Sequence, residues 1–139
     1  MAKFEIIEHT ADVGIRAWGD SIEEAFENVA LGMFSIIGDV DKVDVVGEAE
    51  VRVENEDIEG LLVDWLSELL YLFDTERIFL GKFKVSIEKL GEKYMLKGRV
   101  YGEKYDPKKH GMGVEIKAVT YHMLSVDTEK NEVKVLFDI

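Results

Sequence analysis

Apolar residues recur at helical spacing in two segments of the chain. In the first, Ile22–Ile37, they fall every three or four residues, and the preceding Ser21 and the later Glu24 have the spacing of a capping box. Gly38 offers this helix a natural end. The second segment, Ile58–Asp74, follows acidic residues that suit the positive end of a helix dipole. The pattern predicts two long helices, each with one apolar face for a sheet.

Most of the other apolar residues alternate with polar ones, which is typical of strands. The expected strands are Phe4–Glu8, Val13–Trp18, Glu48–Glu54, Lys82–Lys89, Lys93–Tyr101, Glu115–Val126 and Glu132–Phe137, with hairpin turns at Gly91 and near Asp127–Asn131 and a polar loop at Tyr105–Gly113. The order of elements predicts an α+β fold. We expect a single compact domain over residues 1–139, with the two main helices packed on one or two largely antiparallel sheets.

A histidine, a threonine and an aspartate are crowded into His9–Asp12, between two expected strands. On the second strand, Asp12 and Gly14 would face one side of the sheet, while Val13 and Ile15 would face the other. Asp12 is therefore either part of a turn or a ligand whose partners come from elsewhere in the chain. The local pattern leaves both interpretations open.

Composition narrows the chemistry. The chain has 139 residues, no cysteine and a net charge of −12, so thiolate metal sites and cysteine nucleophiles are excluded. The negative charge argues against strong direct binding to nucleic acid, which depends on neutralising phosphates with lysine and arginine. No signal peptide and no membrane span is evident, so we expect a cytoplasmic protein that does not bind membranes.

Two charged stretches invite a functional interpretation. The acidic residues Asp39, Asp41 and Glu50 do not make a calcium loop, because Val43 replaces the third ligand and Asp44 stands where such a loop needs glycine. The basic stretch at 108–110 is either a contact for a phosphate or an acidic partner, or simply a solvated surface. The three histidines lack the spacing of a metal site, and no catalytic motif is evident.

The end of the chain is the second unusual feature. The last expected strand is apolar almost to the final residue, so Asp138 and the α-carboxylate of Ile139 would form an adjacent pair of anionic groups. If this strand lies beside Asp12, three carboxylates converge, which is unfavourable unless they are protonated or bridged by a cation. Such oxygen ligands suit calcium, magnesium or manganese.

Four motifs give the chain a resemblance to a known family. They are His9–Ile15, Leu62–Leu66, Lys117–His122 and the closing pair Asp138–Ile139. Together they resemble the archease family over essentially the whole length. The resemblance implies a compact α+β fold and an accessory role in tRNA splicing. Archeases assist the RtcB-type RNA-splicing ligase, helping it to load guanylate on its active-site histidine and to sustain turnover, and some have been linked to tRNA methyltransferases.

The same resemblance assigns roles to residues of this chain. It implies a divalent cation, usually calcium, bound by Asp12, Asp138 and Ile139. Lys117 is an additional candidate for contact with the partner. On an unbroken strand its side chain would face away from His122, on the same side as Val119 and Tyr121, so packing of its stem on the sheet is the alternative. His9 and Thr10 are expected to form a hydrogen-bonded turn that orients Asp12.

Two other functions stay open at this level. One is a small metal-dependent hydrolase or phosphoesterase in which the carboxylates activate water, although no general base is evident. The other is a protein-interaction module whose metal is purely structural. The expected mode of action is transient docking, in which an acidic protein is steered electrostatically toward a basic ligase.

Overall fold

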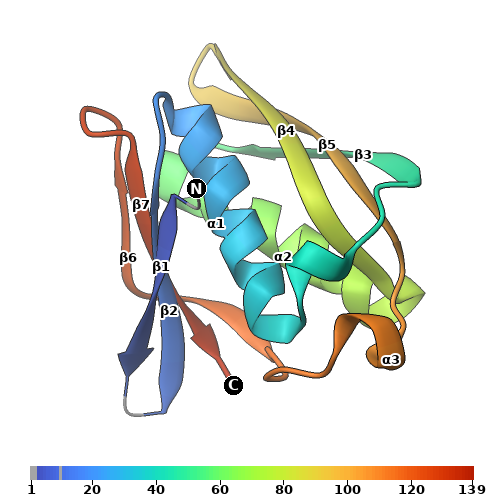
Figure 1. Ribbon diagram of the computed structural model, residues 1–139. Coiled ribbons are helices and arrows are strands. Elements are labelled where there is room, and N and C mark those ends of the chain that lie inside the picture. Colours follow the sequence, from blue (N-terminus) through green and yellow to red (C-terminus); the bar gives the residue numbers. More distant parts are fainter. Residues whose placement is uncertain (1–2, 10) are drawn as a thin grey trace.

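Two helices lie between two antiparallel sheets in the computed structural model, which describes residues 3–9 and 11–139 (Figure 1). Helix α1 spans Ile22–Ile37 and helix α2 spans Ile58–Glu76. One sheet has the order β1-β2-β7-β6 and the other has the order β3-β5-β4. The strands are β1 (Phe4–His9), β2 (Asp12–Trp18), β3 (Gly47–Asn55), β4 (Ile78–Leu90), β5 (Lys93–Lys104), β6 (Ala118–Asp127) and β7 (Glu132–Asp138); the described residues also include a short 3-10 helix, η1 (Val40–Lys42), and helix α3 (Pro107–His110). The predicted α+β class is confirmed.

Side-chain caps explain where both long helices begin. The Ser21 hydroxyl accepts the backbone N–H of Glu24 at 3.1 Å, as the capping-box spacing predicted. The Asp57 carboxylate accepts the N–H of Gly60 in the same way at the start of α2. Helix α2 continues past the expected Asp74 to Glu76 and ends at Arg77, whose φ of 54° is left-handed.

The core fills the space between the sheets. Both helices are buried along their apolar stripes, and the inner sides of β2 and β7 contribute Ile15 and Val135 from the four-stranded sheet. Trp65 of α2 is fully buried, and its indole N–H donates to the carbonyl oxygen of Phe26 in α1 at 3.1 Å. Gly98 lets β5 approach this ring, because a Cβ there would lie 2.5 Å from it. The outer sides of both sheets are left facing solvent.

Three predicted boundaries need correction. The expected polar loop at Tyr105–Gly113 contains α3, which Asp106 caps and Pro107 starts. Strand β4 begins at Ile78 rather than Lys82, with an irregularity in its pairing to β5 near its start. Strand β6 begins at Ala118 rather than Glu115. The other strand and turn positions agree with expectation to within a few residues. No helix of the described residues is long and apolar enough to cross a membrane.

Candidate functional site at the meeting of the first and last strands

Asp12 and Asp138 occupy directly opposite positions on β2 and β7. Opposite residues of an antiparallel pair project from the same side of the sheet, with Cβ atoms about 4.5–5.5 Å apart. That side faces away from the helices, because the next residues inward, Val13 and Phe137, pack in the core. Asp12 is half-buried and Asp138 is exposed. The two carboxylates therefore share one solvent-facing surface.

The last residue of the chain lies at the same place. Phe137 is fully buried and Asp138 still belongs to β7, so the strand is held in the sheet up to its end. The backbone N–H of Lys117 donates to the carbonyl oxygen of Asp138 at 2.7 Å, which ties the final peptide to the segment before β6. These contacts keep the α-carboxylate of Ile139 one residue away from the Asp12–Asp138 pair.

A close contact between β2 and β7 lies next to the Asp12–Asp138 pair. Gly14 lies opposite Leu136, two residues from Asp12 and Asp138 on the same side of the sheet. Leu136 is only 1% exposed although it is on the outer side. It leans over Gly14, where a Cβ would lie 2.5 Å from its Cδ2 atom and 3.0 Å from the carbonyl oxygen of Val135. The absence of a side chain at Gly14 therefore leaves room for Leu136, two residues along the strands from Asp12 and Asp138.

The donor set fits a hard divalent cation. Asp12 and Asp138 supply carboxylate oxygens, and like charges directly opposite each other on a sheet are unfavourable without a counter-charge. Over residues 3–9 and 11–139 there is no group of three His, Cys, Asp or Glu side chains placed to hold a metal. The expectation that the α-carboxylate of Ile139 is the third anionic ligand stays a prediction. Calcium accepts such mixed oxygen sets and completes its shell with water.

Lys117 lies at the edge of this site through its backbone, and its side chain is exposed. The expectation that it faces away from His122 assumed an unbroken strand. The pairing of β6 with β7 is instead irregular between Thr120 and Ser125, and Met123 has a left-handed φ of 56°. The alternation of side chains between the two sides of the sheet is therefore broken along β6. The orientation of His122 does not determine that of Lys117.

The turn between β1 and β2 brings His9 opposite Asp12 along the backbone. Thr10 lies outside the described residues, so the expected hydrogen-bonded turn stays a prediction. The acidic residues at 39–50 are spread over separate elements. Asp39 caps η1 by accepting the N–H of Asp41, whereas Glu50 belongs to β3. This arrangement agrees with rejecting a calcium loop there.

The basic stretch 108–110 is mostly engaged within the protein. The Lys109 ammonium lies 2.6 Å from the Asp44 carboxylate and 2.7 Å from that of Glu103. His110 is fully buried, and its Nε2 atom lies 2.8 Å from Glu103. Both interpretations of this stretch are therefore wrong for His110, which is buried. Lys109 is engaged by two carboxylates, so it is not a free contact for a phosphate.

Glu103 interacts with Asp44, Lys109 and His110. It accepts the backbone N–H of Asp44 at 2.8 Å, and this bond, followed by those from Lys109 and His110, lowers the pKa of Glu103 to about 2. The carboxylates of Asp44 and Glu103 raise the pKa of Lys109. The hydrogen bond to Asp44 has the larger effect and the hydrogen bond to Glu103 the next. The Nδ1 atom of His110 accepts the N–H of Asp106 at 3.0 Å, so Nε2 carries the ring proton and donates it to Glu103.

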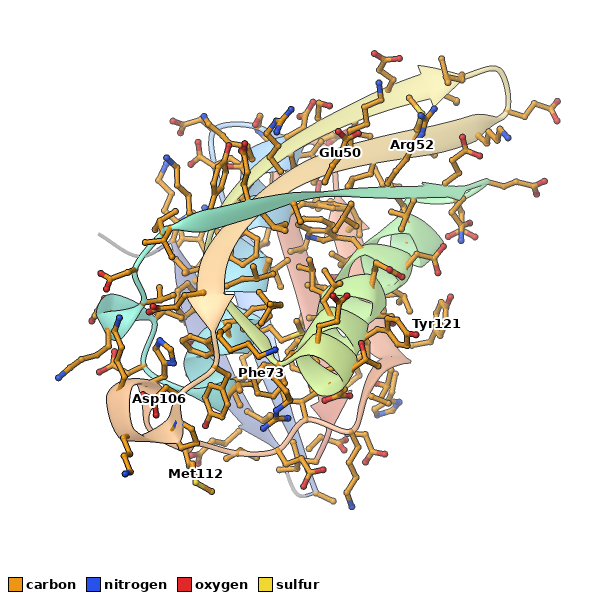
Figure 2. All side chains as sticks on the ribbon, turned by 90° about the vertical axis from the view of Figure 1, so that its right-hand side faces the viewer. Glu50, Arg52, Phe73, Asp106, Met112 and Tyr121 are labelled. Atoms are coloured by element: carbon orange, nitrogen blue, oxygen red, sulfur yellow. The ribbon has the colours of Figure 1, made fainter. Side chains whose placement is uncertain are left out.

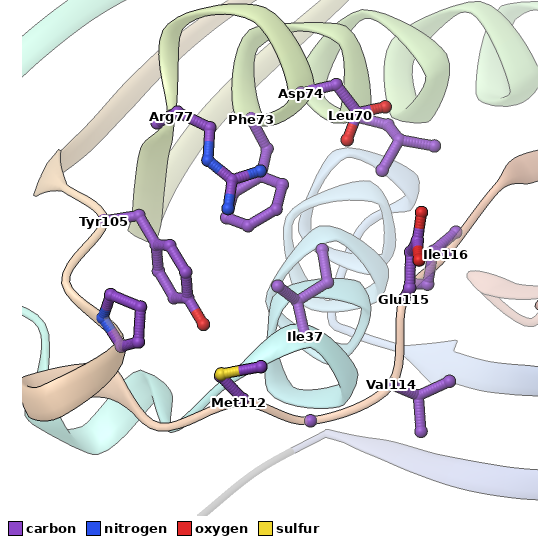
Figure 3. A pocket seen from close by; sticks show the side chains of 12 residues that line it. Ile37, Leu70, Phe73, Asp74, Arg77, Tyr105, Met112, Val114, Glu115 and Ile116 are labelled. Atoms are coloured by element: carbon purple, nitrogen blue, oxygen red, sulfur yellow. The ribbon is translucent and has the colours of Figure 1, made fainter.

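Sequence reasoning missed a hollow of about 400 Å³ at the C-terminal end of α2 (Figure 3). The guanidinium of Arg77 lies 4.6 Å from the ring centroid of Phe73 and 5.2 Å from that of Tyr105. Met112 lies at the rim and is 80% exposed. The contributing residues come from the ends of α1 and α2, from α3 and the residue Tyr105 that follows β5, and from the irregular segment 111–117, so no short motif could have revealed the hollow.

The irregular segment 111–117 connects this hollow to the carboxylate site. Its Gly113 and Val114 N–H groups donate to the carbonyl oxygens of Ile37 and Ile36, which satisfies the end of α1. The Tyr105 hydroxyl donates to the carbonyl oxygen of Gly111 at 2.5 Å. The segment is thus fixed along its length before it reaches the site.

Comparisons with known proteins agree with this architecture. The family model of the archease protein family (MTH1598/TM1083) matches residues 4–139. Two similar curated relatives, both called protein archease, come from Pyrococcus furiosus, with 50% identity over 91% of this chain and 89% of the relative, and from Sulfurisphaera tokodaii, with 41% identity over 94% and 93%. The solution structure of protein 1598 of Methanobacterium thermoautotrophicum has a TM-score of 0.84 at 40% identity and is matched over the full length of both chains.

Fold and site define a class of small α+β proteins in which two helices separate two antiparallel sheets and the first strands meet the last one at a pair of aspartates. With a family model that covers nearly the whole chain and relatives at up to 50% identity, the chain belongs to the archease family.

Proposed function

We propose that this protein is an accessory factor of an RtcB-type RNA-splicing ligase in tRNA splicing. In this proposal it binds a divalent cation, calcium in the first instance, through Asp12, Asp138 and the α-carboxylate of Ile139. It docks transiently on the ligase, promotes guanylylation of the ligase and sustains multiple turnover. The protein acts in the cytoplasm and is not itself the catalyst.

The observation that carries the proposal is the opposition of Asp12 and Asp138 beside the chain end. The two side chains lie on an exposed face rather than in a closed cavity, so they can be presented to another protein. A cation held there would supply positive charge to neutralise phosphate oxygens at the partner's active site. The pairing of β2 with β7 would hold the oxygens of Asp12 and Asp138 in place, and the buried Phe137 keeps the end of β7 in the sheet.

The negative net charge of the protein fits a docking role. The chain carries a net charge of −12, so long-range attraction to a basic, RNA-binding enzyme would speed their encounter. Neither the carboxylate pair nor its strand neighbours Gly14 and Leu136 supply an evident nucleophile. These features favour an activator over a hydrolase.

The test is a ligation assay under multiple turnover with purified ligase. Asp12→Asn and Asp138→Asn should each reduce stimulation of the ligase at least tenfold. Asp41→Asn removes the same charge at a distant exposed position and should keep wild-type stimulation. Circular dichroism should show the same fold for all three. Wild-type stimulation by both site variants would refute the proposal.

Two further measurements separate the rival functions. Hydrolysis of generic phosphoesters by the isolated protein, dependent on a divalent ion and lost in Asp12→Asn, would identify a hydrolase instead. Full stimulation by a metal-free site variant that still folds would identify an interaction module whose metal is structural.

A further inference from the structure

The outer face of the three-stranded sheet concentrates positive charge on an otherwise acidic protein. The residues that share this face follow from the strand register, in which opposite positions project from the same side. The rows across β3, β5 and β4 are Glu48–Tyr101–Lys82, Glu50–Arg99–Lys84, Arg52–Lys97–Ser86 and Glu54–Met95–Glu88. Figure 2 shows Glu50 and Arg52 on the side of the sheet that faces away from α2. We call this surface the outer β4–β5 face.

Most of these cations form no ion pair within residues 3–9 and 11–139. Lys82, Lys84, Lys97 and Arg52 make no ion pair with any described residue, and all four are exposed. Among the described residues, Arg99 is paired with Glu48 alone, at 3.3 Å, and both side chains are more than half exposed. Such a pair contributes little and exchanges easily with a stronger anion.

The acidic residues of the face are set apart from the cations. Glu48, Glu50 and Glu54 all lie on β3, and Glu88 lies near the hairpin end of β4. The cations of β4 and β5, together with Tyr101, therefore form a continuous area with the carboxylates along its border. The chain as a whole has 29 acidic and 17 basic side chains, so this area is unlike the average surface.

The geometry of this area is regular and open. Alternate residues of a strand are about 6.6 Å apart and neighbouring strands about 4.8 Å apart, so the cations form a grid. Part of the grid borders a hollow of about 500 Å³ whose lining includes Lys84, Ser86, Lys97 and Arg99, with the carboxylates of Glu27 and Glu50 at its edge. The Lys82 ammonium lies 5.2 Å from the ring centroid of Tyr101, which places a cation beside an aromatic ring.

We propose that the outer β4–β5 face binds the phosphate backbone of single-stranded RNA. Lys82, Lys84, Lys97 and Arg99 contact the phosphates, and Tyr101 offers a ring for base stacking. The proposal rests on the proposed function, since it identifies RNA as the polyanion that the protein meets in a complex with an RNA ligase. It adds a second working surface on the sheet that does not carry the carboxylate site.

Two features favour RNA over an acidic protein segment. Phosphates follow one another at regular intervals along a nucleic acid, which matches a grid of cations better than it matches scattered carboxylates. Basic sheet surfaces with aromatic side chains are a recurring way to bind single strands without sequence preference. The net charge of −12 limits the free protein to weak binding, and a ligase that already holds the RNA would raise the local concentration.

The experiment titrates a fluorescein-labelled 12-nucleotide oligouridylate with the isolated protein at 50 and 200 mM salt. Contacts to about four phosphates predict a slope of log K against log salt of about −2.8, hence about a 50-fold loss of affinity between the two salt concentrations. The triple variant Lys82→Gln, Lys84→Gln, Lys97→Gln should bind at least tenfold more weakly at 50 mM salt, with a slope near −0.7. The matched control Lys42→Gln, Lys108→Gln, Lys130→Gln changes the net charge equally and should bind like the wild type.

Three results would overturn the proposal: no measurable binding at 50 mM salt, equal loss in both triple variants, or equally tight binding of a glutamate-rich peptide of the same charge. A failure of this proposal can be distinguished from a failure of the proposed ligase role. Asp12→Asn should bind the oligouridylate normally while losing stimulation of the ligase. Conversely, the triple variant of Lys82, Lys84 and Lys97 should keep calcium binding, while the KM of the ligase for its RNA substrate should rise when this variant replaces the wild type.

Discussion

Asp12 and Asp138 face each other across β2 and β7, although they stand near opposite ends of the chain. The pairing fixes both carboxylates on the outer side of the four-stranded sheet, with Ile139 one residue away. Two like charges in this position cost free energy in the folded protein unless something positive joins them. The relationship therefore links stability to ion binding, and this link can be measured.

Calcium should raise the melting temperature of the wild-type protein and not that of Asp138→Asn. An ion that binds only the folded state stabilises it by about 2.7 kcal/mol at a concentration of 100 times its Kd. In EDTA this difference in response should disappear, because the ion's contribution is absent from both proteins. Differential scanning calorimetry with and without calcium checks the expectation, and an equal response of the two proteins to calcium contradicts the account.

Gly14→Ala should destabilise the protein by about 1–3 kcal/mol, because the new methyl group would displace the buried Leu136. The shift should also disturb the adjacent carboxylates and weaken calcium binding. Gly47→Ala in β3 is the matched control, since a Cβ there would meet its nearest atom at 3.5 Å. Urea unfolding of the two variants measures the difference. If Gly14→Ala is as stable as Gly47→Ala, the packing of Leu136 on Gly14 does not constrain the site.

Glu103 predicts a contribution to stability that depends on pH. Its pKa is about 2 in the folded protein, well below the usual carboxyl value, so the unfolded chain takes up the proton first on acidification. The stabilisation is therefore fully present above about pH 5 and is lost as the pH falls toward 2. Glu103→Gln should unfold more easily than the wild type at pH 7, and the gap should close toward pH 2. Urea unfolding across this range checks the trend, and a gap that does not depend on pH would contradict it.

At physiological salt, the isolated protein should bind tRNA negligibly. The few phosphate contacts of the outer β4–β5 face are screened there, and the net charge of −12 opposes approach. Filter binding or anisotropy at 150 mM salt tests this expectation. Submicromolar affinity with a steep salt dependence would show that the protein reaches RNA without a partner.

Local patterns predicted the helices and most strands because their causes are local. Ser21 and Glu24 form the cap that their spacing indicated, and Asp12 projects from the side of β2 that alternation assigned to it. Helix α3 was missed although Asp106 and Pro107 are a recognisable start signal. The family resemblance, rather than spacing, supplied the identity of the metal ligands.

Other features arise from pairings between distant segments, which a single sequence does not show. The register that places Asp12 opposite Asp138 belongs to two strands at opposite ends of the chain. The pairing of β6 with β7 is irregular around Met123, whose left-handed backbone conformation is not predicted by the residue type. Arg77 and Tyr105 likewise come together only when the end of α2 packs beside the end of β5.

The chain end offers the most direct test of the central claim that the α-carboxylate of Ile139 completes a cation site with Asp12 and Asp138. Adding Gly-Gly after Ile139 moves this carboxylate by roughly 3.3 Å per residue along the strand, farther than a calcium–oxygen bond of about 2.3–2.6 Å. Calcium titration by calorimetry is to be compared with that of a protein carrying the same two glycines at its N-terminus. We predict that the C-terminal extension loses calcium binding and stimulation of the ligase together, while the N-terminal one keeps both. Wild-type calcium affinity and stimulation in the C-terminally extended protein would contradict the account.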